Sequence, residues 1–205
     1  EEASTLFYER GYRGTTLDAI AERLEVSKPF IYHHFKSKAE LLVEIYKRVL
    51  RFCLDTVDAA VAGSDSAREQ VRAFAVAYTQ IVIKEQAIVA IFFREEQNLP
   101  PEEIDSINAL KREFDGKLSA MLEKGVAKGE FEITDIRLAT LALTGMMNWT
   151  YTWYRANGRL PPDAIATLVA PDVTEDPVFG RLSGLCLSDF FLTAAVDRLR
   201  REVAS

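Results

Sequence analysis

TTLDAIAERLEVSKPFIYHHFKSKAELL, residues 15–42, is the stretch that decides the fold of this chain. Its apolar spacing predicts one short helix over residues 17–24 and another over residues 28–35, with three residues between them. Thr16 and Ser27 stand at the two N-cap positions, where a hydroxyl can accept a hydrogen bond from a free backbone N–H. Two short helices joined by so tight a turn indicate a helix-turn-helix unit.

The side chains that face inward predict a compact core for this unit. Ala21 is small enough to let the second helix cross the first closely, and Glu25 occupies a turn position that needs a positive φ. A residue other than Gly costs about 1 kcal/mol at such a position. The predicted core residues are Leu6, Phe7, Ile20, Leu24, Val26, Ile31 and Phe35.

The outer face of residues 28–35 is the first candidate site. A helix N-terminus with a Lys suits phosphate, and Phe30 can pack on a thymine methyl group in the major groove. We expect His33 to contact phosphate or base and His34 to have a packing role. The predicted DNA-binding residues are Thr15, Thr16, Ser27, Lys28, Pro29, Phe30, Tyr32, His33 and Lys38.

Two other interpretations apply to this stretch. Neighbouring histidines on a helix point about 100° apart, and the chain has no other His, so no metal site is predicted. The second alternative is an ordinary three-helix unit in which Lys28 and Lys38 are merely solvated.

Composition and charge narrow the class of protein. The chain has 205 residues, 48% hydrophobic and 27% charged, so it can bury a core in one or two domains. Its net charge is −6, but residues 1–54 hold nine Lys/Arg against eight Asp/Glu, so an anionic partner is expected there. With only two cysteines, no export signal and no apolar run near the roughly 18 residues of a membrane span, we expect a cytoplasmic protein without membrane contact.

The rest of the chain predicts further helices and no strands, so the expected fold class is all-α. Capping boxes begin two helices, at Ser37 with Glu40 and at Ser66 with Glu69. Residues 135–157 are apolar all round, which predicts burial on more than one side. The predicted helices are 37–62, 66–97 with a break near 84–86, 101–125 closed by Gly125 and Gly129, 135–157, 161–170 and 182–202.

The first 50 residues resemble the DNA-binding domain of TetR/AcrR-family repressors. The motifs that carry the resemblance are Leu6-Phe7, Gly11-Tyr12, Thr15-Thr16, Ile20-Ala21, Val26-Ser27-Lys28, Ile31 to Phe35, Ser37-Lys38 and Leu41-Leu42. Pro29-Phe30 replaces a Gly-Thr pair common in the family, and Glu25 replaces a Gly, which leaves the operator sequence open but not the docking mode. The resemblance implies a helix-turn-helix domain over residues 1–50, a ligand-binding and dimerisation domain over 51–205, a homodimer, a palindromic double-stranded DNA operator and a small-molecule inducer.

A second resemblance concerns the C-terminal part. Phe92-Phe93-Arg94-Glu95-Glu96, Leu99-Pro100, Asn148-Trp149, Trp153-Tyr154 and Gly158-Arg159-Leu160 are similar to the ligand domain of TetR-family regulators of fatty-acid, phenylacetate and steroid catabolism. That similarity implies a CoA thioester as inducer. The aromatic and thioether side chains also predict a mostly apolar pocket with a few polar anchors. The predicted ligand-binding residues are Phe74, Tyr78, Phe92, Phe93, Arg94, Met121, Met146, Asn148, Trp149 and Trp153.

Alternatives remain for parts of that set. Trp149 and Trp153, four residues apart, equally fit a core or a dimer interface, and Arg94 could pair with a surface carboxylate, a contact that contributes little. Residues 135–157 and 161–170 are natural donors of a two-fold four-helix interface.

The sequence therefore predicts a ligand-released repressor, with an acyl-CoA as the first candidate ligand. One alternative is a regulator of an efflux pump that senses hydrophobic drugs, and another, of a different class, is a helical adaptor that does not bind DNA. No enzyme, cofactor or metal is expected. The chain has no His outside the N-terminal unit, no Gly-rich phosphate loop, and no His-Glu-x-x-His, Cys-x-x-Cys or Gly-x-Ser-x-Gly motif.

Overall fold

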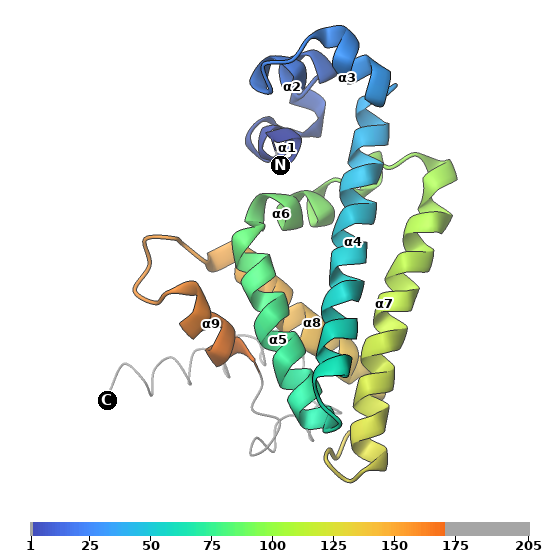
Figure 1. Ribbon diagram of the computed structural model, residues 1–205, viewed down its shortest axis with the longest axis vertical. Coiled ribbons are helices and arrows are strands. Elements are labelled where there is room, and N and C mark those ends of the chain that lie inside the picture. Colours follow the sequence, from blue (N-terminus) through green and yellow to red (C-terminus); the bar gives the residue numbers. More distant parts are fainter. Residues whose placement is uncertain (1, 171–205) are drawn as a thin grey trace. The chain divides into compact units, whose positions relative to one another are not determined.

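A computed structural model describes residues 2–170 of the chain, and in that range every regular element is a helix (Figure 1). The predicted all-α class is confirmed. The predicted helix over 182–202 lies outside the described residues. The helices are α1 (Glu2–Gly14), α2 (Leu17–Arg23), α3 (Lys28–His34), α4 (Lys38–Gly63), α5 (Ala67–Lys84), α6 (Gln86–Arg94), the 3₁₀ helix η1 (Glu96–Asn98), α7 (Pro101–Ala127), α8 (Ile136–Trp153) and α9 (Pro162–Val169).

The chain divides into two compact units. Unit 1 comprises Glu1–Asp55 and Lys84–Phe114, and unit 2 comprises Thr56–Ile83 and Asp115–Ser205. Helices α4 and α7 therefore contribute residues to both units. The break predicted near residues 84–86 is confirmed, since α5 ends at Lys84 and α6 begins at Gln86.

In unit 1, local hydrogen bonds set the helix-turn-helix as the sequence predicts. The Thr16 hydroxyl oxygen accepts a bond from the Ala19 N–H at 3.1 Å, and the Ser27 hydroxyl oxygen accepts one from the Phe30 N–H at 3.4 Å. Glu25, in the turn between α2 and α3, has φ +56° and is the one positive-φ residue other than Gly in the part of the chain described. Both N-caps and the left-handed turn position are thus confirmed.

The core of unit 1 holds the predicted inward side chains with one exception. Leu6, Phe7, Ile20 and Ile31 are almost completely buried. Leu24 is also a predicted core residue, but it is 42% exposed. It stands at the C-cap, one residue beyond the end of α2, where the chain has already left the buried face of the helix.

Helix α6 joins this core because its C-terminal carbonyl groups are held by α4. The Tyr46 hydroxyl donates to the backbone oxygens of Phe92 at 2.6 Å and Ile91 at 3.2 Å, and its ring stacks on the Phe92 ring. Burial, and next the Glu96 and Glu95 carboxylates, raise the pKa of the Tyr46 phenol. A neutral donor therefore ties the end of α6 to α4.

Of the two hydrogen bonds predicted for the capping box at the start of α4, the structure has one. The Ser37 hydroxyl oxygen accepts from the Glu40 N–H at 3.1 Å, as predicted. The Glu40 carboxylate accepts from the Lys36 N–H at 2.7 Å instead of the Ser37 N–H. The carboxylate thus reaches one residue further back than the capping-box geometry assumes.

In unit 2 the N-terminus of α5 is capped from a distance. Ser66 accepts from the Glu69 N–H, as the predicted capping box requires. The carboxylate that serves the free backbone N–H groups, however, belongs to Glu130: it accepts from the Arg68 N–H at 2.8 Å, the Ala67 N–H at 3.3 Å and the Ser66 hydroxyl at 2.8 Å. Foremost the bond from the Arg68 N–H, and then that from Ser66, lower the pKa of Glu130. The Ser66 N–H, which the capping box assigns to Glu69, donates instead to the Ser64 hydroxyl oxygen at 3.1 Å, so the expectation for Glu69 is wrong.

The two glycines predicted to end α7 have different roles. Gly129 has φ +69° and lies just past the helix, as a C-terminal glycine does. Gly125 lies inside α7, and a Cβ built there would stand 2.1 Å from the Phe131 ring. Gly125 is therefore needed for close packing and does not end the helix.

Helix α8 is buried over much of its circumference and exposed along one stripe. Ala139, Leu143 and Met147 are almost completely buried. Leu141, Trp149 and Trp153 are 52%, 59% and 41% exposed. Together with the partly exposed Gly145 they recur every four residues, and we call this set the α8 stripe.

Within residues 2–170, no single helix has both the length and the apolar character needed to cross a bilayer. Within the same residues, α5 and α6 taken together are long and apolar enough for a span, but a sharp bend separates them.

Candidate nucleic-acid interface and ligand-binding unit

Helix α3 presents an exposed face of mixed character. Phe30 and Tyr32 are each 51% exposed, whereas Ile31 between them is 4% exposed and packs into the core. Ser27, Lys28, Pro29 and His33 are exposed as well. The condition for a groove-reading helix, one face locked and the other open, is met.

A carboxylate that the sequence reasoning missed lies on this face. The Lys28 Nζ donates to Oδ2 of Asp18 at 2.5 Å, which pairs the first residue of α3 with the first turn of α2. The hydrogen bond from Lys28 lowers the pKa of the Asp18 carboxyl, and the same pair raises the pKa of Lys28. Asp18 therefore orients one predicted DNA contact. Its place in the first turn of α2 was visible in the sequence, but its partner was not.

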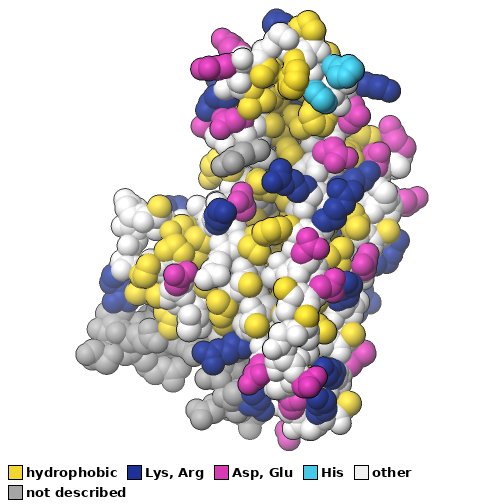
Figure 2. All heavy atoms as spheres, viewed as in Figure 1, with side chains coloured by type: hydrophobic (Ala, Val, Ile, Leu, Met, Phe, Trp, Pro, Cys, Tyr) yellow, Lys and Arg dark blue, Asp and Glu magenta, His cyan; other side chains and the backbone are white. Residues whose placement is uncertain are grey.

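Both histidines, coloured cyan in Figure 2, lie on the surface beside exposed apolar side chains. The His34 ring contacts the Phe30 ring edge-on at 4.8 Å between centroids, and the His33 ring at 5.3 Å. His34 thus packs against the Phe30 ring on the surface of the protein, where it remains exposed. Across the described residues, no group of three or more His, Cys, Asp or Glu side chains could hold a metal ion.

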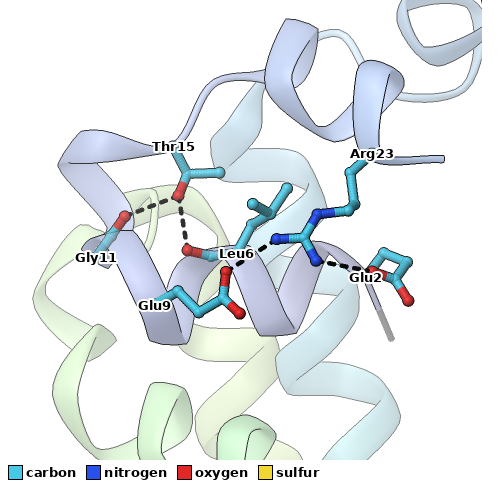
Figure 3. A network of polar contacts seen from close by, with 6 residues as sticks. All are labelled: Glu2, Leu6, Glu9, Gly11, Thr15 and Arg23. Atoms are coloured by element: carbon cyan, nitrogen blue, oxygen red, sulfur yellow. Dashed lines mark hydrogen bonds and ion pairs between the residues drawn. The ribbon is translucent and has the colours of Figure 1, made fainter. Parts of the chain in front are cut away.

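Thr15 points toward Leu6 and Gly11 of α1, as Figure 3 shows. It is completely buried, and its hydroxyl donates to the carbonyl oxygens of Gly11 at 2.9 Å and Leu6 at 3.1 Å. Gly11 interrupts α1 with φ +71°, so its carbonyl has left the regular helix ladder and Thr15 supplies a donor. This corrects the expectation for Thr15, whereas Thr16 is exposed at the start of α2.

Lys38, at the start of α4, is held by the end of α1. Its Nζ donates to the Tyr12 carbonyl oxygen at 2.7 Å and lies 4.3 Å from the centre of the Tyr12 ring. The Tyr12 N–H in turn donates to the Glu95 carboxylate at 3.4 Å. The predicted phosphate contact thus also links three segments of unit 1.

In unit 2 the structure brings some of the predicted ligand residues together. The Tyr78 hydroxyl of α5 is 3.0 Å from Oδ1 of Asn148 on α8, to which it donates, and its ring contacts that of Phe74. Phe74 is completely buried, and Met121 is 3% exposed. Met146 is partly exposed on α8, while Trp149 and Trp153 belong to the exposed α8 stripe.

Phe92, Phe93 and Arg94 lie in unit 1, at the end of α6. The Phe92 ring stacks on Tyr46 at 4.7 Å and meets the Phe93 ring edge-on. The Arg94 guanidinium lies 5.9 Å from the centre of the Tyr8 ring of α1. These contacts anchor α6 on α1 and α4.

Comparisons with known proteins agree over both parts of the chain. Residues 1–45 match the family described as bacterial regulatory proteins, tetR family, and residues 64–172 match the family described as tetracyclin repressor-like, C-terminal domain. The HTH-type transcriptional repressor KstR2 of Rhodococcus jostii strain RHA1 is 30% identical over 166 residues, 80% of this chain and 81% of that protein.

Solved structures show the same relationship. The TetR-family transcriptional regulator PfmR from Thermus thermophilus superposes with a TM-score of 0.75 at 30% identity, covering 82% of this chain and 94% of that one. AibR, in complex with isovaleryl coenzyme A and operator DNA, superposes with a TM-score of 0.72 at 27% identity, covering 81% of this chain and 90% of the AibR chain. These relatives are regulators and not enzymes. With an exposed face on helix α3 of a capped helix-turn-helix and with matches over both of its parts, this chain belongs to the TetR family of bacterial transcriptional regulators.

Proposed function

We propose that this regulator is a repressor that binds a palindromic double-stranded operator as a homodimer and is released by a hydrophobic small molecule, a CoA thioester. It acts in the cytoplasm, where a bacterial chromosome is accessible. Residues 1–50 read DNA, and residues 51–205 bind the ligand and form the dimer. The observation that carries the proposal is the division of α3 into a buried Ile31 and an exposed row of aromatic, proline and cationic side chains.

For DNA binding, the exposed residues at the start of α3 supply base contacts and those at neighbouring helix starts supply phosphate contacts. Phe30 packs on a thymine methyl group, and Tyr32 and His33 reach base edges or phosphates. Thr16, Ser27 and Lys38 stand at helix N-termini, where backbone N–H groups attract phosphate. Two copies of α3 then lie about one helical turn of DNA apart.

For the homodimer, the α8 stripe is the surface that a second copy covers. Leu141, Trp149 and Trp153 are large apolar side chains that lie exposed on one face of one helix. Aromatic residues of this kind are typical of the buried centre of protein interfaces. The exposure favours the interface role of the two tryptophans over a role in the ligand pocket.

For the ligand, unit 2 supplies apolar walls and a polar anchor. Phe74 and Met121 are buried, and the bond between Tyr78 and Asn148 places polar groups between α5 and α8. A mostly apolar chamber with few polar groups is typical of small-molecule sites. The solved relative AibR holds isovaleryl coenzyme A, which supports a CoA thioester as the class of ligand for this chain.

Release follows from a difference in ligand affinity between two states of the protein. Coupling between two sites typically amounts to about 1–3 kcal/mol, or roughly 5–150-fold in affinity. Helix α4 contributes to both units, and its N-terminal half holds α6 through Tyr46. We propose that ligand binding in unit 2 acts on the reading face through this helix.

The operator test starts from duplex DNA that the protein selects from a random-sequence pool, followed by gel shift. Tyr32→Ala should weaken operator binding at least 10-fold by removing a contact on the reading face, while the oligomeric state stays unchanged. Tyr8→Ala is the matched control, because Tyr8 is an exposed tyrosine of α1, 50% exposed against 51% for Tyr32. Equal binding by Tyr32→Ala and wild type would exclude α3 as the reading helix.

The dimer is tested by light scattering on Trp149→Glu, which should yield monomers because a charge cannot be buried unpaired in the interface. Val126→Glu, 37% exposed on α7, is the control and should remain dimeric. A Trp149→Glu protein that stays dimeric would place the interface elsewhere.

The ligand class is tested by adding acyl-CoA to the protein–operator complex. Isovaleryl-CoA or a longer acyl-CoA should release the operator, and free CoA should not. Release by unrelated hydrophobic drugs and not by any acyl-CoA would favour the efflux-pump alternative.

A further inference from the structure

Two threonine hydroxyls inside unit 2 have no hydrogen-bond partner. Thr79 of α5 and Thr150 of α8 are completely buried, and within residues 2–170 neither hydroxyl has a hydrogen-bond partner. A buried hydroxyl without a partner is costly, and such groups in folded proteins call for an explanation.

Other helical threonines of this chain show what a satisfied hydroxyl does. Thr140 donates to the Ile136 carbonyl oxygen at 2.8 Å, and Thr144 donates to the Thr140 carbonyl oxygen at 3.0 Å. This bond to the preceding helical turn is available to any Thr in a helix. Neither Thr79 nor Thr150 makes this bond.

Two contacts between α5 and α8 indicate that Thr79 and Thr150 lie at a similar level along the two helices. The Tyr78–Asn148 bond joins the helices just before this level, and Ile83 packs with Tyr154 just after it. Thr79 and Thr150 lie between these two points of contact along their helices. The two helices run in the same direction here. Residue numbers increase on both helices from the Tyr78–Asn148 contact to the Ile83–Tyr154 contact.

The charges along the two helices restrict which groups can bond to these hydroxyls. Residues 73–83 of α5 and 138–154 of α8 contain no Asp, Glu, Lys or Arg. A buried ionic group would lack a counter-charge from either helix, which makes it unfavourable. The missing partner is therefore neutral and polar.

We propose that Thr79 and Thr150 donate hydrogen bonds to the carbonyl oxygen of an acyl thioester bound in unit 2. A carbonyl oxygen has two lone pairs, so one oxygen satisfies both hydroxyls. The inference rests on the proposed function, because it takes the CoA thioester as the ligand and assigns the residues that recognise its acyl carbonyl. Tyr78 and Asn148 already bond to each other and flank that position.

The test replaces each hydroxyl by a methyl group in Thr79→Val and Thr150→Val, singly and together. Thr144→Val is the matched control, because Thr144 is also buried on α8 but its hydroxyl is already bonded. Without ligand, the first two variants should unfold at a melting temperature equal to or a few degrees above that of wild type, since each removes an unpaired group. The melting temperature of Thr144→Val should not rise above that of wild type.

The ligand probes are isovaleryl-CoA and octanoyl-CoA, each compared with its S-alkyl thioether, in which CH₂ replaces the carbonyl. Calorimetry should show that wild type and Thr144→Val bind the thioester about 10-fold or more tighter than the thioether. In the double Val variant the two should bind within about twofold of each other, because the thioether lacks only the group that the hydroxyls recognise.

A double Val variant that keeps the full preference for the thioester overturns the inference. So does a wild-type protein that binds its operator but neither thioester, and in that case the DNA-binding part of the proposed function stands. A protein that shows the hydroxyl-dependent preference but selects no operator supports the inference and instead refutes the repressor function.

Discussion

Two glycines of α7 should respond in opposite ways to the same substitution by alanine. A Cβ added at Gly116 meets no heavy atom within 4 Å. A Cβ added at Gly125 would lie 2.1 Å from Cδ2 and 2.2 Å from Cε2 of Phe131, and 3.1 Å from the Cβ of Ala67. Because Phe131 is only 6% exposed, its ring cannot escape into solvent.

The expected changes in stability follow from the helix propensity of alanine and from the overlap between the added Cβ and its neighbours. Alanine in place of a helical glycine gains about 0.5–1 kcal/mol, so Gly116→Ala should raise the melting temperature by about 1–4 °C for a chain of this size. At position 125 the added atom lies about 1.3 Å inside ordinary contact distance, and overpacking of a core typically costs about 1–3 kcal/mol. Since the propensity gain is common to both variants, their melting temperatures should differ by about 2–12 °C.

The assay is thermal unfolding followed by circular dichroism, with urea unfolding as a second measurement. Combining Gly125→Ala with Phe131→Ala completes a double-mutant cycle, and in that background the alanine at 125 should no longer destabilise, because the clashing ring is gone. If the two single variants are equally stable, Phe131 does not pack against Gly125 and the reasoning fails.

Three further substitutions test separate features. Glu25→Gly should raise the melting temperature by about 2–4 °C, because Gly relieves the positive φ at about 1 kcal/mol; a fall would mean that the turn holds no strain. Asp18→Asn should steepen the dependence of log operator affinity on log salt by about 0.9 per protomer, because Lys28 becomes free for a phosphate; an unchanged slope would show that Lys28 does not reach one. Glu130→Gln should lower the melting temperature at neutral pH, because the folded protein holds the pKa of Glu130 below its ordinary value of 4.5. The stability from this carboxylate is present above pH 4.5 and is lost as the pH falls through the lowered pKa, so the two proteins should converge in acid; a constant difference would exclude the charge as the cause.

The sequence alone determined the features that depend on neighbouring residues. The caps by Thr16 and Ser27, the positive φ of Glu25 and the inward position of Ile31 each need only a few consecutive residues. Capping, turn geometry and helical periodicity are local physics, and for that reason the helix-turn-helix and the all-α class could be predicted.

Where the expectations were wrong, the deciding hydrogen bond or helix end was one that the local pattern does not specify. Glu130 caps the start of α5 from more than 60 residues away, while Ser64 holds the Ser66 N–H in place of Glu69. Thr15 was drawn inward by two carbonyl groups of α1. Leu24 became exposed because the end of α2 fell one residue before it.

Only the tertiary structure could decide which polar groups find partners and which do not. The pairing of Asp18 with Lys28, the hold of Tyr46 on α6, and the unpartnered hydroxyls of Thr79 and Thr150 all depend on how helices pack. Whether a buried hydroxyl is satisfied depends on a few tenths of an ångström and on its rotamer. The packed neighbours of a residue set these distances and rotamers, and they cannot be predicted from the periodicity of the sequence.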